Sequence, residues 1–254
     1  MCSMMTQNNT NLKDILNKIP ANTIVTAKKL KENGVSYSLM RAYENSGWLT
    51  RHSAGAYTRL AEIADILGAL YAIQKDCRLS VHIGADTALK MVYGKIHFLK
   101  PTKEICLFAF SGTKLPSWFK IAYNGQYSLH LTNFLPNKLG LIPYKNNNYE
   151  IDVPNIERSL LELLYLVPKV ITAQEAYSIT ETIQSLRTGV LQQLLEQCSS
   201  IKVKRLLLCF AEQSGQQWIK AIDLKKIDFG KGIREIEKGG ILYKKYGLVL
   251  PRLG

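Results

Sequence analysis

Arg41 and Asn45 stand four residues apart and carry the hydrogen-bonding groups with which proteins read base pairs. A guanidinium group can donate two parallel hydrogen bonds to guanine, and a carboxamide can bond to adenine in a similar way. Tyr37 and Ser38 precede them at helical spacing, so the four side chains would share the outward face of one helix. This pattern predicts a helix that contacts base edges and phosphates in DNA.

The residues before this helix supply the elements that would hold it in place. Apolar residues recur at i, i+3, i+4 and i+7 over residues 11–19, which predicts a first helix that Pro20 ends. Thr26 is a suitable N-cap for a second helix, and Ser36 for the third. Between these two helices, Gly34 suits a turn that needs a left-handed residue. The order predicts a helix-turn-helix motif.

The residues after the third helix have the pattern of a β-hairpin. Trp48 and Leu49 begin one strand, residues 53–55 form a tight turn, and residues 56–58 return as the second strand. We therefore expect a winged helix-turn-helix, and the alternative is a small helical subdomain that binds protein. The residues expected to contact DNA are Lys28, Ser36, Tyr37, Ser38, Arg41, Asn45, Arg51, His52 and Arg59.

The net charge of +13 is concentrated at the two ends of the chain. Residues 1–60 hold eight lysines and arginines against three acidic residues, and residues 201–254 hold twelve against five. Basic segments of this kind commonly bind polyphosphate, because neutralising phosphates releases counterions. A basic protein kept soluble by its charge is the alternative.

The cysteines and the hydropathy of the chain indicate the cellular compartment of the protein. The five cysteines have no CxxC spacing and lie mostly in apolar runs, which favours free thiols in a reducing environment. The first ten residues are polar and do not resemble a signal peptide. No uncharged apolar run approaches the roughly 18 residues that would span a bilayer. We expect a cytoplasmic protein without membrane contact.

The rest of the chain predicts a mixed α/β domain. The fold class is therefore α+β, with a winged-helix domain over 1–60, a larger domain over 61–254 and an internal boundary near 133–150. Helices are expected over 60–75, 86–92, 155–167, 173–186 and 190–198. Strands are expected over 79–83, 96–99, 105–110, 118–122, 128–131, 218–224 and 241–250, and residues 203–210 suit either a helix or a strand.

Residue types that could support catalysis or bind metal are present without a convincing arrangement. His82, His97 and His130 match no metal-ligand spacing, so we expect neither a metal nor a cofactor. Phosphate-binding GxxxxGK[ST] and nucleophile GxSxG motifs are absent from the sequence. The remaining enzymatic alternative is a Mg²⁺-dependent nuclease built from Glu212, Asp223 and Lys225. We expect a protein that is not an enzyme.

An ordered set of segments resembles the AbiEi-type antitoxins of type IV, or abortive infection E, toxin–antitoxin systems. After the winged-helix pattern come SVHIGADTALKMVYGKIHFL, KLPSWFK, IERSLLELL, IKVKRLLLCFAE and GGILYKKYGLVLP. The resemblance extends from about Leu12 to Pro251. No single segment is specific, but their order is.

The resemblance implies a repressor of its own operon that binds repeated promoter sites through the winged helix. It also implies a C-terminal domain that counteracts a nucleotidyltransferase-like toxin without forming a stable complex with it. We expect a basic surface on that domain made of Lys202, Lys204, Arg205, Lys225, Lys226, Lys231, Arg234, Lys244 and Lys245. A ligand-responsive winged-helix regulator, with residues 61–254 as the sensor, is the alternative function.

Overall fold

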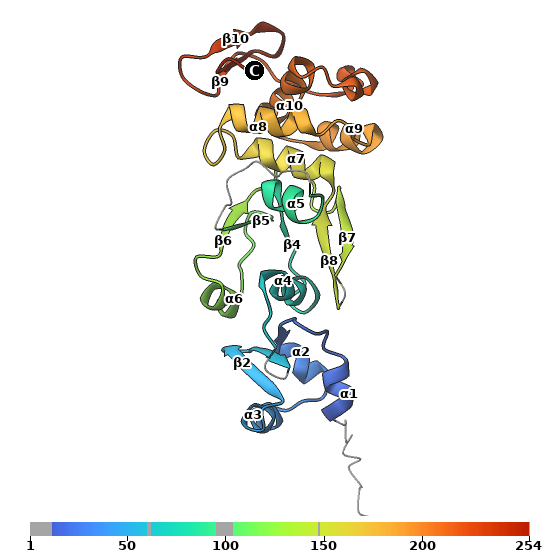
Figure 1. Cartoon of the computed structure of the whole chain (residues 1–254), viewed down its shortest axis with the longest axis vertical. Coiled ribbons are helices and arrows are strands. Elements are labelled where there is room, and N and C mark those ends of the chain that lie inside the picture. Colours follow the sequence, from blue (N-terminus) through green and yellow to red (C-terminus); the bar gives the residue numbers. More distant parts are fainter. Residues whose placement is uncertain (1–11, 60–61, 95–103, 147, 254) are drawn as a thin grey trace, which may run out of the picture. The chain divides into compact units, whose positions relative to one another are not determined.

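The structure is a computed structural model that describes residues 12–59, 62–94, 104–146 and 148–253 (Figure 1). The chain divides into two compact units. The first contains Met1–Val81, Thr113–Gln126 and Pro143–Asp152, and the second contains His82–Gly112, Tyr127–Ile142 and Val153–Gly254. Both combine helices with strands, which confirms the α+β class. The expected boundary at residue 60 and the internal one near 133–150 stay predictions.

The first unit begins with the predicted helix-turn-helix and wing. Its strands pair in the order β1-β3-β2, and β2 and β3 are antiparallel. Apolar side chains of these elements, among them Leu30, Met40 and Leu49, form one buried cluster. The elements are α1 (Leu12–Asn17), β1 (Val25–Thr26), α2 (Ala27–Glu32), α3 (Tyr37–Asn45), β2 (Leu49–Ser53) and β3 (Ala56–Arg59).

The helix caps and the turns are those predicted. The Thr26 hydroxyl accepts a hydrogen bond from the Lys29 amide at 3.1 Å, which satisfies a free N–H group at the start of α2. Gly34 has a φ of 88° in the turn between α2 and α3, a conformation that costs glycine little. Gly55, with a φ of 83°, likewise closes the turn between the wing strands.

Two expectations for the remainder of the first unit are wrong. Helix α4 (Ile66–Lys75) begins later than expected, because the Asp65 carboxylate accepts from the Gly68 amide at 2.8 Å and caps it there. Residues 118–122 form helix α6 (Ser117–Ala122) instead of a strand. Trp118, Phe119 and Tyr123 are buried, which is the i, i+1, i+5 spacing of a helical face.

The second unit contains a small sheet with the strand order β4-β5-β6. Its strands are β4 (Val81–Ile83), β5 (Ile105–Ala109) and β6 (Tyr127–Leu131), and β5 pairs with β6 in parallel. Helix α5 (Ala85–Met91) follows β4. The strand expected over 96–99 lies outside the described residues. At the internal boundary expected near 133–150, strand β7 (Leu141–Lys145) pairs with β8 (Glu150–Pro154), and residues 143–152 of this pair belong to the first unit.

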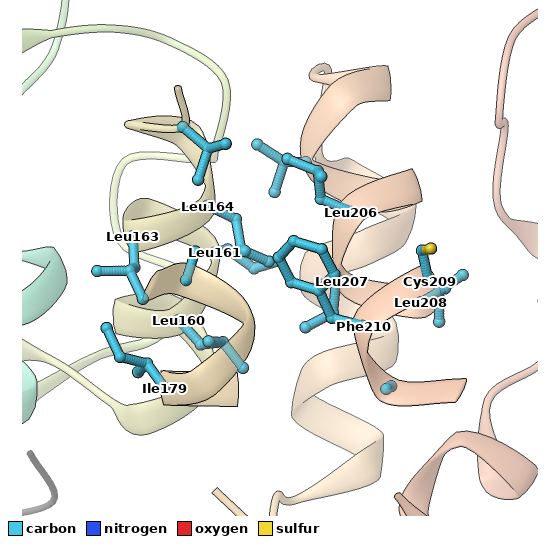
Figure 2. Packing of buried hydrophobic residues seen from close by; sticks show 14 of the residues in the cluster. Leu160, Leu161, Leu163, Leu164, Ile179, Leu206, Leu207, Leu208, Cys209 and Phe210 are labelled. Carbon is cyan, nitrogen blue, oxygen red and sulfur yellow. The ribbon is translucent and has the colours of Figure 1, made fainter. Parts of the chain in front are cut away.

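Helices form the main core of the second unit. They are α7 (Ile156–Tyr165), α8 (Ala173–Thr182), α9 (Thr188–Gln197) and α10 (Ile201–Gln213). Figure 2 shows leucines of α7 facing α10, with Leu206 and Phe210 of α10 directed back toward them. Leu208 and Cys209 lie on the other side of α10 and are also buried. Residues 203–210, for which the sequence allows a helix or a strand, are therefore part of a helix that is buried on both sides.

The C-terminal residues form short turns and strands around α10. Residues 218–224 are 3₁₀ turns instead of the expected strand: η1 (Gln217–Ala221) and η2 (Leu224–Lys226). The strand expected over 241–250 is interrupted by the 3₁₀ turn η3 (Lys244–Tyr246), which Gly247 ends with a φ of 58°. Strands β9 (Arg234–Glu235), β10 (Ile241–Tyr243) and β11 (Leu248–Leu250) form a sheet with the order β10-β11-β9.

Candidate nucleic-acid interface

Helix α3 presents the predicted recognition residues on its exposed side. Tyr37 is 64% exposed, and Ser38, Arg41 and Asn45 are exposed as well. Met40 is 1% exposed and fixes the opposite side of α3 in the core. A nine-residue helix anchored in this way can hold several hydrogen-bonding groups toward a groove of DNA.

The first turn of α3 is ordered by two serine hydroxyls. Ser36 Oγ accepts from the Leu39 amide at 3.2 Å, and it lies 2.9 Å from Ser38 Oγ. Ser36 therefore serves as the N-cap, and its exposed neighbour Ser38 is available to a phosphate at the positive end of the helix.

Lysines of α2 extend this surface. Lys28 is exposed, and Lys31 places its ammonium nitrogen 4.7 Å from the centre of the Tyr37 ring. A cation over an aromatic face is attracted by the ring quadrupole, so the two side chains orient each other. Sequence reasoning missed Lys31, because only the turn between α2 and α3 brings it next to Tyr37.

Of the three wing residues predicted to contact DNA, only Arg51 is exposed. The Arg51 side chain is exposed, with a long 3.5 Å hydrogen bond from Nε to the Ser53 carbonyl. His52 is half-buried, and its Nε2 lies 3.0 Å from Thr58 Oγ1. Burial lowers the pKa of His52 below its ordinary 6.5, so the imidazole is neutral at pH 7.

Arg59 is occupied by contacts within its own unit. Its Nε donates to Glu62 Oε1 at 2.9 Å, and its Nη1 donates to the Leu16 carbonyl at 3.4 Å. The guanidinium thus joins the end of β3 to α1. Arg59 therefore supports the position of the wing, while the Arg51 side chain is exposed.

The predicted basic surface of the second unit needs correction at three positions. Lys204 is 3% exposed and Arg205 is 4% exposed, because both belong to the buried helix α10. Lys202 is half-buried and donates to the carbonyls of Tyr165, at 2.7 Å, and Val167 at the end of α7. Burial lowers the pKa of Lys202 to about 8. The exposed members of the set are Lys225, Lys226, Lys231, Arg234, Lys244 and Lys245.

The two carboxylates of the nuclease alternative, Glu212 and Asp223, bind different partners. Glu212 lies on helix α10, where its Oε1 pairs with Lys245. Asp223 caps η2 by accepting from the Lys225 amide at 3.1 Å. Neither residue lies in a β-strand. No cluster of three or more His, Cys, Asp or Glu side chains suited to a metal ion occurs in the part of the chain that the structure describes.

A helix-turn-helix with an exposed third helix and a β-hairpin wing defines the winged-helix class of proteins. The comparison with protein families agrees and goes further. The chain belongs to the AbiEi family: residues 102–251 match the model described as "Transcriptional regulator, AbiEi antitoxin, Type IV TA system". Residues 8–101 match the N-terminal domain model of the same family. The protein is thus an AbiEi antitoxin and transcriptional regulator of a type IV toxin–antitoxin system.

Among solved structures, the chain is similar to the crystal structure of the RV2827C protein from Mycobacterium tuberculosis. The TM-score is 0.62 at 14% identity, and the match covers 94% of this chain and 89% of that one. This similarity concerns the fold. The comparison with curated proteins gave no match.

Within the described residues, no helix has the length and apolar character needed to cross a membrane.

Proposed function

We propose that the first unit binds repeated sites in the promoter of its own operon and represses transcription. The observation that carries this proposal is the exposed row of Tyr37, Ser38, Arg41 and Asn45 on α3, next to the α2 lysines. Arg41 and Asn45 would contact base edges, and Ser38, Lys28 and Arg51 would contact phosphates.

A gel-shift series with promoter DNA from immediately upstream of the gene tests this function. Wild-type protein should form discrete complexes whose number follows the number of repeated sites. A promoter–reporter fusion should be repressed by the wild type and released by Arg41→Ala. Unchanged repression in that variant would mean that α3 is not the reading helix.

We further propose that the chain counteracts a nucleotidyltransferase-like toxin, and that this activity resides in residues 61–254. Family membership and the second basic segment, which is separate in sequence from the winged helix, support the proposal. Neutralisation would not require a stable antitoxin–toxin complex.

Full-length variants can separate the two activities. Antitoxin carrying Arg41→Ala and Asn45→Ala, expressed from an unrelated promoter, should rescue cells that produce the toxin as well as the wild type does. Loss of rescue would show that DNA binding is part of neutralisation. Size-exclusion chromatography of a mixture of toxin and antitoxin should give two separate peaks, and one shared peak would contradict neutralisation without a stable complex.

A further inference from the structure

The second unit contains a cavity of about 330 Å³ beside the buried helix α10. Its walls include Arg205, Phe229, Gly230, Lys244, Lys245 and Tyr246. Clefts that hold small organic ligands begin at about this size and combine apolar walls with a few polar groups. Here the apolar part includes two aromatic residues, and the three charged members of the lining are all cations.

Arg205 is the unusual member of this lining. It is 4% exposed, yet every hydrogen bond of its guanidinium goes to a backbone carbonyl. Nε donates to Phe229 O at 2.8 Å, and Nη1 donates to Gly232 O at 2.7 Å and to Gly247 O at 3.2 Å. Within the described residues no carboxylate pairs with it, and its Nη2 has no hydrogen-bond partner. Three carbonyl oxygens stabilise this cation without neutralising its charge, so the guanidinium can still pair with an anion.

The neighbouring charges leave the cavity positive. Lys244 is exposed and forms no ion pair with the described residues, and Arg234 is close enough to lower the pKa of Arg205, an effect second to that of burial. Lys245 is paired with Glu212, which also accepts from Tyr246. Asp228, whose Oδ1 accepts from the Gly230 amide at 2.7 Å, is not part of the cavity lining. Glu212 offsets one of the three lining cations, and Arg205 and Lys244 remain unpaired.

We propose that this cavity binds a nucleotide-sized phosphate ester, with the phosphate on Arg205 and Lys244 and a base ring on the wall formed by Phe229 and Tyr246. A guanidinium with a free N–H group and an unpaired ammonium together suit a phosphate oxyanion. Aromatic walls suit any nucleobase, because every base has a flat π-face. This site goes beyond the DNA-binding and antitoxin functions, and it does not require either of them.

Calorimetric titration of the full-length protein tests the proposal. The probes are AMP, GMP, CMP and UMP in separate runs, with adenosine and inorganic phosphate as the two halves of the ligand. At least one monophosphate should bind at a ratio of one to one and more tightly than either half. Equal affinity for inorganic phosphate and for every monophosphate would contradict the proposed contact of the base with Phe229 and Tyr246. If no probe binds, the cavity is not a binding site for phosphate esters.

The Lys244→Gln variant locates the binding. Lys244 is exposed and unpaired in the described residues, so its replacement should leave the fold intact. Loss of one charge-assisted contact should weaken monophosphate binding about tenfold. Lys138→Gln is the matched control, because Lys138 is an exposed lysine of the same unit that does not line the cavity. Unchanged binding in Lys244→Gln, or an equal loss in both variants, would place the ligand elsewhere.

Discussion

The ammonium nitrogen of Lys31 lies 4.7 Å from the centre of the Tyr37 ring and so links α2 to the first turn of α3. This contact keeps a 64% exposed tyrosine in one orientation beside a positive charge. We predict that Tyr37→Ala weakens promoter binding about threefold to tenfold, because an exposed cation–π contact and an aromatic surface are both lost. Tyr37→Phe should bind as the wild type does, since the ring remains. Fluorescence anisotropy with labelled promoter DNA measures both variants, and equal losses would assign the effect to the hydroxyl.

Arg51 and Arg59 should respond differently to the same substitution. Arg51→Gln should reduce the slope of log K against log salt by about one, because one phosphate contact is lost. Arg59→Gln should leave the slope unchanged and lower the free energy of unfolding by about 1 kcal/mol, because its bonds to Glu62 and Leu16 are internal. Anisotropy titrations at several salt concentrations and urea unfolding measure the two effects. A reduced slope in Arg59→Gln would show that this arginine reaches DNA after all.

A buried ion cluster in the second unit predicts a pH dependence. Glu162 Oε1 accepts from His82 Nε2 and from Arg158 Nε, each at 2.8 Å. Burial opposes the charged carboxylate, but His82 and Arg158 outweigh burial and hold the pKa of Glu162 below its ordinary 4.5. The unfolded chain therefore binds this proton at higher pH than the folded chain does. The stability that Glu162 contributes is present above about pH 4.5 and is lost as the pH falls through the lower, folded-state pKa.

The variant Glu162→Gln tests that dependence. At pH 7 it should lower the free energy of unfolding by about 3–5 kcal/mol, because Arg158 is left as an uncompensated buried charge. The difference between the wild type and the variant should narrow as the pH falls below about 4.5. Urea unfolding followed by circular dichroism at pH 7, 5 and 4 measures it. A constant difference over this range would mean that Glu162 does not titrate as proposed.

Gly84 is predicted to tolerate no side chain. A Cβ atom at this position would lie 2.4 Å from Phe108 Cδ2 and 2.6 Å from Glu162 Oε2. Both neighbours are buried, so Gly84→Ala should lower stability by about 1–3 kcal/mol through overpacking. Gly189→Ala is the control: Gly189 lies in helix α9, where a Cβ atom would meet no described atom within 4 Å apart from its chain neighbours and the backbone of its own helix, and the variant should gain up to about 1 kcal/mol. Thermal unfolding of the two variants should shift in opposite directions.

Local rules predict the helix-turn-helix and the wing well and the end of the chain poorly. The caps at Thr26 and Ser36 depend on neighbouring residues alone, so sequence reasoning could find them. The sequence predicts Lys204 and Arg205 at the surface, because their charge is visible in the sequence and the packing of α10 on both sides is not. The pairing of Lys31 with Tyr37 and the carbonyl contacts of Arg205 depend on turns whose geometry no short pattern specifies.

The most direct test of whether α3 reads the promoter is the ratio of the affinities for promoter DNA and for unrelated DNA. Anisotropy titrations at one fixed salt concentration would compare a duplex carrying the promoter repeats with a shuffled duplex of equal composition. The wild type should prefer the promoter duplex by about a thousandfold or more. The double variant Arg41→Ala and Asn45→Ala should lose most of that preference while keeping its binding to the shuffled duplex, because each base contact contributes about 1–3 kcal/mol of discrimination. A double variant that keeps the wild-type preference would contradict the assignment of α3 as the helix that reads DNA.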